Sequence, residues 1–236
     1  MTTRFTAAVA GTGLAAGAFA ALIGAAAAAD ATPARNTHQH VNVRGATHDL
    51  RQAAAQLSRL QTSAGTDTRI SGTDRPGLLT ALGADLGAVQ GDLTALASAT
   101  SQRQVNGILA AGHVTVQLGR DQYLVVVGAG RTETRGQADA ATFATLTSQV
   151  SAAATGGQDM TTENGQLTDM QARLAAASGA VSQSVSGILA VSPSAHRPAV
   201  HSAFASATGD LRTAGAALTA AESDAASVTA ELAALA

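Results

Sequence analysis

Residues 121–136, DQYLVVVGAGRTETRG, contain two glycines spaced as in a dinucleotide-binding motif. That motif needs a buried strand, a glycine-rich turn and a helix, followed by a second parallel strand. Gly128 and Gly130 supply the first two glycines, but Glu133 occupies the third position, where its carboxylate would lie beside a pyrophosphate. Residues 137–165 show no pattern of a second buried strand. We therefore interpret the match as accidental and predict that the chain binds no nucleotide.

Histidines are the residues most suited to bind a metal. His38 and His40 form a His-x-His pair, and neutral imidazoles bind zinc and copper. A closed site needs about four ligands in a fixed geometry, whereas this pair lies in a segment without regular periodicity. The remaining histidines are His48, His113, His196 and His201. We predict that these side chains are solvent-exposed polar groups and that the chain binds no metal.

Arrangements typical of an enzyme are missing from the sequence. It has no cysteine nucleophile, no Gly-x-Ser-x-Gly turn and no Glu-x-x-His pair on a helix. Ser194 lies two residues from His196, but a nucleophile and its base are brought together by the fold and need an orienting acid, so sequence neighbours in a turn are weak evidence. Asp121, beside Arg120, is interpreted as a surface or helix-capping charge. We predict a protein that is not an enzyme, with no catalytic residue and no cofactor.

The composition favours helices. Alanine makes up about a quarter of the 236 residues, lysine and cysteine are absent, and five residues are aromatic. Alanine together with Leu, Gln and Arg favours helix over sheet. The net charge of −2 lacks the clustered positive field that nucleic acid requires, so we predict no nucleic-acid partner. Without cysteine no disulfide can form outside the cytoplasm, and stability must come from burial.

Residues 1–29 are predicted to be a signal peptide. Arg4 supplies a positive start, residues 5–29 carry no charge, and the small residues at 27–31 offer a cleavage site. An uncleaved membrane anchor is the alternative, because an uncharged segment of this length can span a bilayer. We favour cleavage because strongly apolar residues are sparse and glycines interrupt them. Residues 30–46 mix Pro, Thr, Asn and Gly without periodicity and are predicted to be flexible.

Apolar residues at alternating spacings of three and four predict helices over residues 47–236. Six helices are expected, over about Thr47–Leu60, Pro76–Leu96, Ser101–Val127, Thr132–Ala154, Leu167–Ile188 and Phe204–Leu235. Gly128 and Gly130 are expected to end or kink the third helix before the fourth begins. An antiparallel bundle buries all of these apolar stripes. We therefore predict an all-α fold, an elongated antiparallel bundle of long helices with heptad-like Ala/Leu seams typical of coiled-coil packing.

Glycines recur every fourth residue in the second predicted helix. They are Gly83, Gly87 and Gly91. Each costs about 1 kcal/mol of helix propensity relative to alanine. This loss of helix stability predicts that a neighbouring helix packs closely against the face that carries the glycines.

Four stretches, taken in order, resemble a group of exported, alanine-rich, all-helical proteins of actinobacteria. These stretches are residues 73–96, 119–127, 187–204 and 209–225. They hold an Asp-Arg-x-x-Leu-Leu helix start at Asp74, an Arg-x-x-Tyr pattern at Arg120 and a Leu-Ala-x-x-Pro turn that ends at Pro193. The resemblance covers about residues 48–236. It implies an envelope location and a helical fold, and it supplies no catalytic residues.

These observations predict an exported, non-enzymatic helical-bundle protein of the cell envelope or extracellular space. Its expected role is structural or interactive, with long helical faces presented to an envelope protein or wall component. One alternative is a small-ligand or metal carrier that uses the bundle interior or the N-terminal histidines. A polar cluster inside the bundle favours that alternative, whereas an interior of only Ala and Leu counts against it. Another alternative is a membrane-anchored envelope protein that retains its N-terminal segment.

Overall fold

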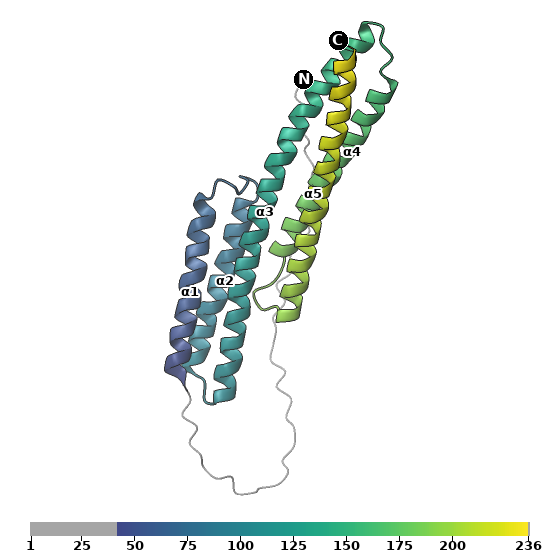
Figure 1. Cartoon of the computed structure of the whole chain (residues 1–236). Coiled ribbons are helices and arrows are strands. Elements are labelled where there is room, and N and C mark those ends of the chain that lie inside the picture. The colour runs from purple at the N-terminus through teal and green to yellow at the C-terminus, as the bar shows by residue number, and fades with distance from the viewer. Residues whose placement is uncertain (1–41, 236) are drawn as a thin grey trace, which may run out of the picture. The chain divides into compact units, whose positions relative to one another are not determined.

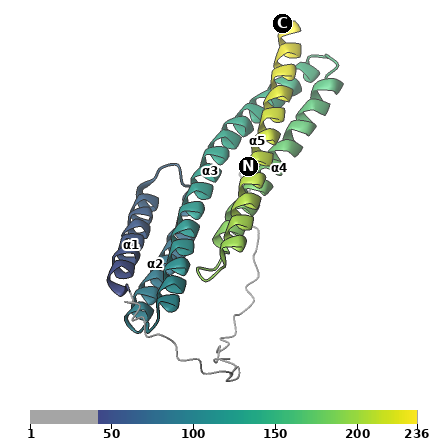
Figure 2. The same ribbon diagram turned by 60° about the horizontal axis from the view of Figure 1, so that its bottom comes forward.

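The computed structural model describes residues 42–235, which form five α-helices and no strand (Figure 1). The helices are α1 (Val43–Thr66), α2 (Arg75–Ala97), α3 (Gln102–Thr155), α4 (Thr161–Leu189) and α5 (Arg197–Ala234). α1 and α2 pack against the N-terminal half of α3, and α4 and α5 pack against its C-terminal half, as Figures 1 and 2 show. The predicted all-α bundle is therefore confirmed.

The first helix begins earlier than predicted. Asn42 caps α1 by accepting a hydrogen bond from the backbone N–H of Gly45 at 3.0 Å. Ala46, four residues ahead of the next apolar position, is buried at 2% exposure. The prediction of a flexible segment up to residue 46 was therefore wrong for residues 43–46. An asparagine at the N-cap can start a helix even where the first helical residues show no apolar periodicity. The predicted signal peptide, the rest of that segment, His38 and His40 lie outside the described residues.

α3 is one continuous helix of 54 residues, about 80 Å long at 1.5 Å per residue. The predicted break at Gly128 and Gly130 was wrong, and the two helices expected on either side of it are halves of α3. Gly130 is buried against the backbone carbonyl of Arg69, and a Cβ atom at this position would overlap with that carbonyl oxygen. Glycine serves here for the close approach of the α1–α2 loop, not for ending a helix. Residues 123–127 are helical, so the strand that a dinucleotide-binding motif requires is not formed.

Close approach of neighbours occurs at glycines of α3 instead of those predicted in α2. A Cβ atom on Gly87 or Gly91 would meet open space, and one on Gly83 would lie 3.6 Å from Nε2 of Gln61 in α1, an ordinary contact. The prediction of close approach along this face of α2 was therefore wrong. A Cβ atom on Gly119 of α3 would lie 2.5 Å from Cδ2 of Leu57, and one on Gly112 would overlap with Leu50. These two α3 glycines are seven residues apart on one face, and they let the leucines of α1 pack onto the helix backbone.

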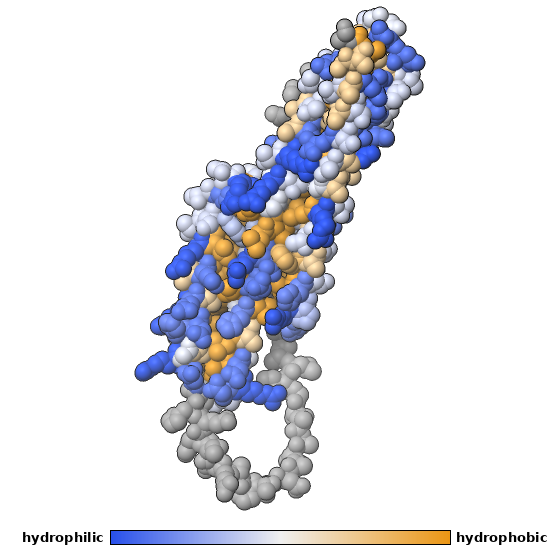
Figure 3. Space-filling view, in the orientation of Figure 1, coloured by the Kyte–Doolittle hydropathy of each residue, from blue (hydrophilic) through white to orange (hydrophobic). Residues whose placement is uncertain are grey.

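The predicted Ala/Leu seams are buried at many of their positions and partly exposed at others, such as Leu79 and Leu235. In α5 the buried positions include Ala207, Ala214, Leu218, Ala221, Ala225 and Val228. In α2 the fully buried aliphatic residues are Leu78, Leu82, Val89 and Leu96. Figure 3 shows hydrophobic side chains over the middle of α3 and along its borders with α1 and α5, with polar residues around them. None of the five described helices has an apolar stretch sufficient to cross a lipid bilayer.

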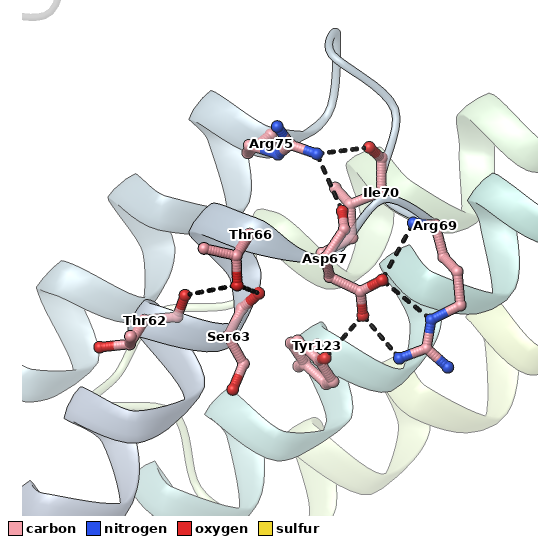
Figure 4. A network of polar contacts seen from close by, with 8 residues as sticks. All are labelled: Thr62, Ser63, Thr66, Asp67, Arg69, Ile70, Arg75 and Tyr123. Carbon is pink, nitrogen blue, oxygen red and sulfur yellow. Dashed lines mark hydrogen bonds and ion pairs between the residues drawn. The ribbon is translucent and has the colours of Figure 1, made fainter.

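A polar network holds the α1–α2 loop on α3 (Figure 4). The Asp67 carboxylate accepts hydrogen bonds from Arg69 Nε at 2.9 Å and Nη2 at 2.6 Å, and from the Tyr123 hydroxyl at 2.8 Å. Arg75 Nη2 donates to the carbonyls of Asp67 at 2.8 Å and Ile70 at 3.1 Å. The Arg69 hydrogen bonds, followed by that of Tyr123, hold the pKa of the Asp67 carboxyl well below its usual range. These hydrogen bonds hold the α1–α2 loop on α3. The absence of a side chain at Gly130 makes room for the loop there.

Replacing Tyr123 by phenylalanine is expected to lower the free energy of unfolding by about 1.5–3 kcal/mol, the usual contribution of a hydrogen bond to a charged group. Urea denaturation measures this loss. A double-mutant cycle with Asp67→Asn supplies the control, because partners in one network lose less together than the sum of their separate losses. Additive losses in the cycle would show that the two side chains stabilise the fold independently.

Candidate functional site

A cavity of about 500 Å³, wide open to the surface, lies where α2, α3 and the α4–α5 loop meet. Pro76, Gly77, Thr80 and Ala84 of its wall are exposed. Most of its wall is apolar or small, formed by Pro76, Gly77, Ala81, Ala84, Leu189, Val191 and Pro193. Its polar residues are Thr80 and Asp85 from α2 and Gln122 from α3. A cavity with a mainly apolar wall and a few polar groups is the usual form of a small-molecule site.

Asp85 is the charged residue of this cavity. Its side chain is fully buried, and neither carboxylate oxygen has a hydrogen-bond partner among the described residues. Oδ2 lies 3.1 Å from the place where a Cβ atom of Gly119 would be, so the bare backbone of α3 makes room for the carboxyl group. Burial raises the pKa of Asp85 to about 7. A buried carboxylate without a counter-ion favours its protonated form, which explains the direction of this shift.

Gln122 is the second polar residue at the cavity. It is fully buried, and both Nε2 and Oε1 lack hydrogen-bond partners in the described part of the chain. Gln122 follows Gly119 by three residues, which places both on one face of α3, opposite Asp85 of α2. A buried polar group left without a partner costs about 1–3 kcal/mol. The polar atoms of Asp85 and Gln122 have almost no exposed surface, so nothing that enters the cavity touches them in the described conformation, and their burial costs stability.

The sequence pattern did not reveal this site. The apolar spacing predicted a buried stripe that left Asp85 outside it, formed by Leu79, Leu82, Leu86, Val89, Leu93 and Leu96. In the structure Leu82, Val89 and Leu96 are fully buried as predicted. Leu79, Leu86 and Leu93 are only partly buried, and the buried face is turned toward Leu78 and Asp85. The signal that was present is the seven-residue step from Leu78 to Asp85, which continues to Asp92. An aspartate seven residues after a buried leucine lies on the same face of the helix, so this spacing indicates a polar group on the buried face.

A second cavity of about 680 Å³ adjoins the first and shares Pro193 with it. Asp92 and Thr115 line it together with the α4–α5 loop. The hydroxyl of Thr115 lies 3.1 Å from the Pro193 carbonyl of the loop and 3.1 Å from the Ala111 carbonyl of its own helix, and its single proton is shared between these two acceptors. This contact lies beside the loop residues that line both cavities.

The sequence neighbours Ser194 and His196 both line this second cavity, but the structure does not pair them. Ser194 Oγ shares a hydrogen bond with Ser192 Oγ at 2.8 Å, and His196 precedes the first turn of α5. The two residues are also exposed. A serine activated by a base needs a direct hydrogen bond between them, so this pair does not form a nucleophile in the described geometry.

The other candidate residues lie apart from the cavity. The described histidines, His48, His113, His196 and His201, are exposed as predicted. Within residues 42–235, no three histidine, aspartate or glutamate side chains meet as possible metal ligands. Asp121 was predicted to be a surface charge, and that was wrong. It is 3% exposed and accepts a hydrogen bond from Gln117 Nε2 at 2.7 Å. Because α3 packs against the four other described helices, more of its circumference is covered than that of a helix with one buried face.

A groove of about 770 Å³ runs between the α1–α2 loop, the middle of α3 and α4. Glu133, the residue at the third position of the glycine motif, lines this groove with Ser71 and Asp74. Burial and the neighbouring Asp74 carboxylate raise the pKa of Glu133. Leu174, Val181 and other residues of α4 supply its apolar wall.

Comparison with known proteins leaves the site to be interpreted from its own geometry. No family model matches the chain, and no match was found among curated proteins or among solved structures.

Proposed function

We propose that the protein is an exported, non-enzymatic helical bundle that binds a small polar ligand in the cavity of Asp85 and Gln122. The observation that supports this function is a pair of fully buried polar side chains beside one cavity, neither with a hydrogen-bond partner among the described residues. Their polar atoms are covered, so a ligand reaches them only when the side chains around them move. An interior of only Ala and Leu would have counted against a carrier. A ligand that bonds to both groups removes the cost of their burial.

The size and chemistry of the cavity suit binding better than catalysis. Its volume of about 500 Å³ lies within the range of roughly 300–1,000 Å³ typical of small-molecule sites. A carboxyl and an amide on an apolar wall can hold and orient a ligand. A bond-breaking reaction needs in addition an activated nucleophile or an acid–base pair at the same place. We therefore assign a carrier or sensor role to the cavity.

A ligand screen by thermal shift tests this function. The wild-type chain and the Gln122→Leu variant are screened in parallel, because leucine replaces both polar atoms of Gln122 at similar volume. We expect ligands that raise the melting temperature of the wild type and bind the variant at least about tenfold more weakly, a loss of 1.4 kcal/mol. Gln90→Leu, at an exposed position of α2, is the matched control and should bind as the wild type does. A ligand that binds Gln122→Leu with unchanged affinity would contradict the proposal.

A protein-interaction role is the second candidate, and the groove between the α1–α2 loop, α3 and α4 favours it. The groove combines an apolar wall from α4 with polar residues of the loop, the composition of a surface that receives another chain. The proposed partner is an envelope protein or a wall component. Crosslinking in intact cells from Ser182, an α4 residue of the groove changed to cysteine in this cysteine-free chain, tests this role. A crosslink that forms equally from exposed Ser206 of α5 would contradict it.

Export is proposed from the N-terminal sequence and can be tested separately. N-terminal sequencing of the protein from culture supernatant is expected to give a start near Asp30 or Thr32. Protein found with an intact N-terminus in the membrane fraction would replace cleavage with the anchored alternative.

A further inference from the structure

We propose that the protein binds the surface of an anionic lipid membrane through one strip of its helical bundle. The strip consists of Arg120, Leu124 and Arg131 on α3 and of Arg212 on the neighbouring α5, and we call these residues the Arg–Leu strip. All four are exposed, and none of them lines the cavities or the groove described above. This contact is independent of the proposed binding of a small ligand.

Unpaired positive charge is concentrated on one part of the described chain. Nine arginines are exposed, and Arg69 is the one among them that forms an ion pair within residues 42–235, with Asp67. The other eight lie on α1, on α3 up to residue 131 and on α5 up to residue 212, where Asp49 is the one exposed acidic residue. They are Arg44, Arg51, Arg59, Arg103, Arg120, Arg131, Arg197 and Arg212. Such an excess of one sign attracts a partner of the opposite charge.

The rest of the described bundle does not supply that partner in a second copy. Its two arginines are both paired, Arg135 with Glu222 at 2.6 Å and Arg173 with Asp224 at 2.9 Å. Arg135 follows Arg131 by one helical turn, so the Arg135–Glu222 pair continues the side of the strip and carries no net charge. A second copy turned end to end would therefore offer the arginines of the strip a neutral surface.

Helix geometry places the three α3 residues on one exposed face. Leu124 follows Arg120 by four residues, and Arg131 follows Leu124 by seven, which keeps all three on the same side of the helix. Together they extend along about 17 Å of α3. The strip is therefore a straight helix face, and such a face suits a flat partner.

Arg212 of α5 lies on the same side of the bundle. α5 runs beside α3 in both views of the ribbon (Figures 1 and 2). Arg135 Nη2 donates to the hydroxyl of Thr219 at 3.0 Å and so bridges α3 and α5 on this side. Arg131 precedes Arg135 by four residues, and Arg212 precedes Thr219 by seven, so each lies on the same helix face as its end of this bridge. Both helices thus present an arginine along one seam.

Leu124 favours a lipid surface over a soluble polyanion. It is 55% exposed, the highest value among the large hydrophobic residues of the described chain. A leucine between arginines gains little from a polymer dissolved in water. At a membrane, the leucine enters the boundary of the acyl chains while the arginines reach the phosphate groups of the lipids. A helix face that combines positive and apolar side chains is typical of a peripheral membrane contact.

Vesicle sedimentation of the full chain tests where the contact lies. Two triple variants remove the same charge and are compared on vesicles of phosphatidylcholine with phosphatidylglycerol. They are Arg120→Gln/Arg131→Gln/Arg212→Gln in the strip and Arg44→Gln/Arg51→Gln/Arg103→Gln outside it. We expect the strip variant to bind at least about tenfold more weakly than the wild type, because each arginine at an anionic surface adds to the affinity. The second variant should lose less than about threefold, since charges farther from the lipids are screened by salt. Residues 1–29 are identical in all three proteins, so their own contribution cancels.

Tryptophan fluorescence tests whether residue 124 enters the bilayer. The chain contains no tryptophan, so Leu124→Trp introduces a single reporter at an exposed position. We expect its emission to shift to shorter wavelength with phosphatidylglycerol vesicles, and to stay unchanged with vesicles of phosphatidylcholine alone and with soluble polyphosphate. Gln90→Trp, at an exposed position of α2, is the matched control and should shift with none of the three.

Equal losses in the two triple variants, or equal binding to vesicles of phosphatidylcholine alone, would overturn the membrane contact of the strip. Binding of polyphosphate as tight as that of vesicles, without a shift in Leu124→Trp, would assign the strip to a soluble polyanion instead. A shift that grows with protein concentration when vesicles are absent would assign it to a second copy.

Discussion

Gly130→Ala is expected to lower the free energy of unfolding by about 3 kcal/mol or more, a loss at the upper end of those caused by overpacking. The added methyl group would overlap with the backbone carbonyl of Arg69. A flexible side chain can turn away from such a contact, but the loop that holds this carbonyl is anchored by Asp67 to Tyr123 and by Arg75 to the loop carbonyls. Either the loop or α3 must therefore move. Urea denaturation of the variant measures the cost.

Gly87→Ala in α2 is the matched control for this prediction. The same change of side chain meets open space at an exposed position of a helix, and it is expected to stabilise the protein by about 0.5–1 kcal/mol because alanine favours the helix. Opposite signs in the two variants would show that close packing, not helix propensity, decides the effect at Gly130. A neutral Gly130→Ala would refute the tight contact between the loop and α3.

Asp85→Asn is expected to remove a pH dependence of stability that the wild type shows between about pH 4 and pH 7. The pKa of Asp85 is about 7 in the folded protein, against an ordinary value of 3.8. The folded state therefore binds more protons than the unfolded state between these values, and wild-type stability falls as the pH rises through this window. At 1.36 kcal/mol per unit of pKa, the loss above pH 7 is on the order of 4 kcal/mol at most. The side chain of the asparagine variant does not ionise, so its free energy of unfolding does not fall for this reason as the pH rises.

Chemical denaturation of both proteins from pH 4 to pH 8 tests this expectation. The two free energies of unfolding should be similar near pH 4 and should diverge toward pH 8, where the variant is the more stable. Asp49→Asn, at an exposed position of α1, is the control and should keep the slope of the wild type. Parallel curves for wild type and Asp85→Asn would show that Asp85 is ionised in the folded protein throughout this range.

Helix positions that follow a local rule were predictable from the sequence. The Ala/Leu seam of α5 repeats for several heptads, and the buried residues from Ala207 to Val228 follow it. Pro76 marks the start of α2, where a missing N–H has no cost. These features depend on residues within one or two turns of each other, so one sequence is sufficient to predict them.

The features that were missed depend on residues far apart in the chain. A glycine can end a helix or admit a neighbour, and only the presence of the Arg69 carbonyl decides between these roles at Gly130. The polarity of the cavity likewise depends on α2 and α3 meeting with Asp85 and Gln122 on the facing sides. A small turn of the buried stripe of α2 brings Asp85 inside. The apolar spacing of a leucine-rich helix does not determine such a rotation, because leucines lie on both sides of the stripe.

Because α3 is one unbroken helix, the face that it turns toward α1 and α2 has a fixed rotation about the helix axis relative to the face that it turns toward α4 and α5. Each residue of a helix advances by about 100° around the axis, so one residue added or removed near Gly128 would turn one half of α3 by that angle relative to the other. The faces toward α1 and α2 and those toward α4 and α5 could not then all stay buried. An insertion of seven residues would change the phase by only about 20°. The centre of α3 is therefore a place where length can change only in steps close to a whole number of turns, such as about seven or eleven residues, although its glycines look like those of a turn.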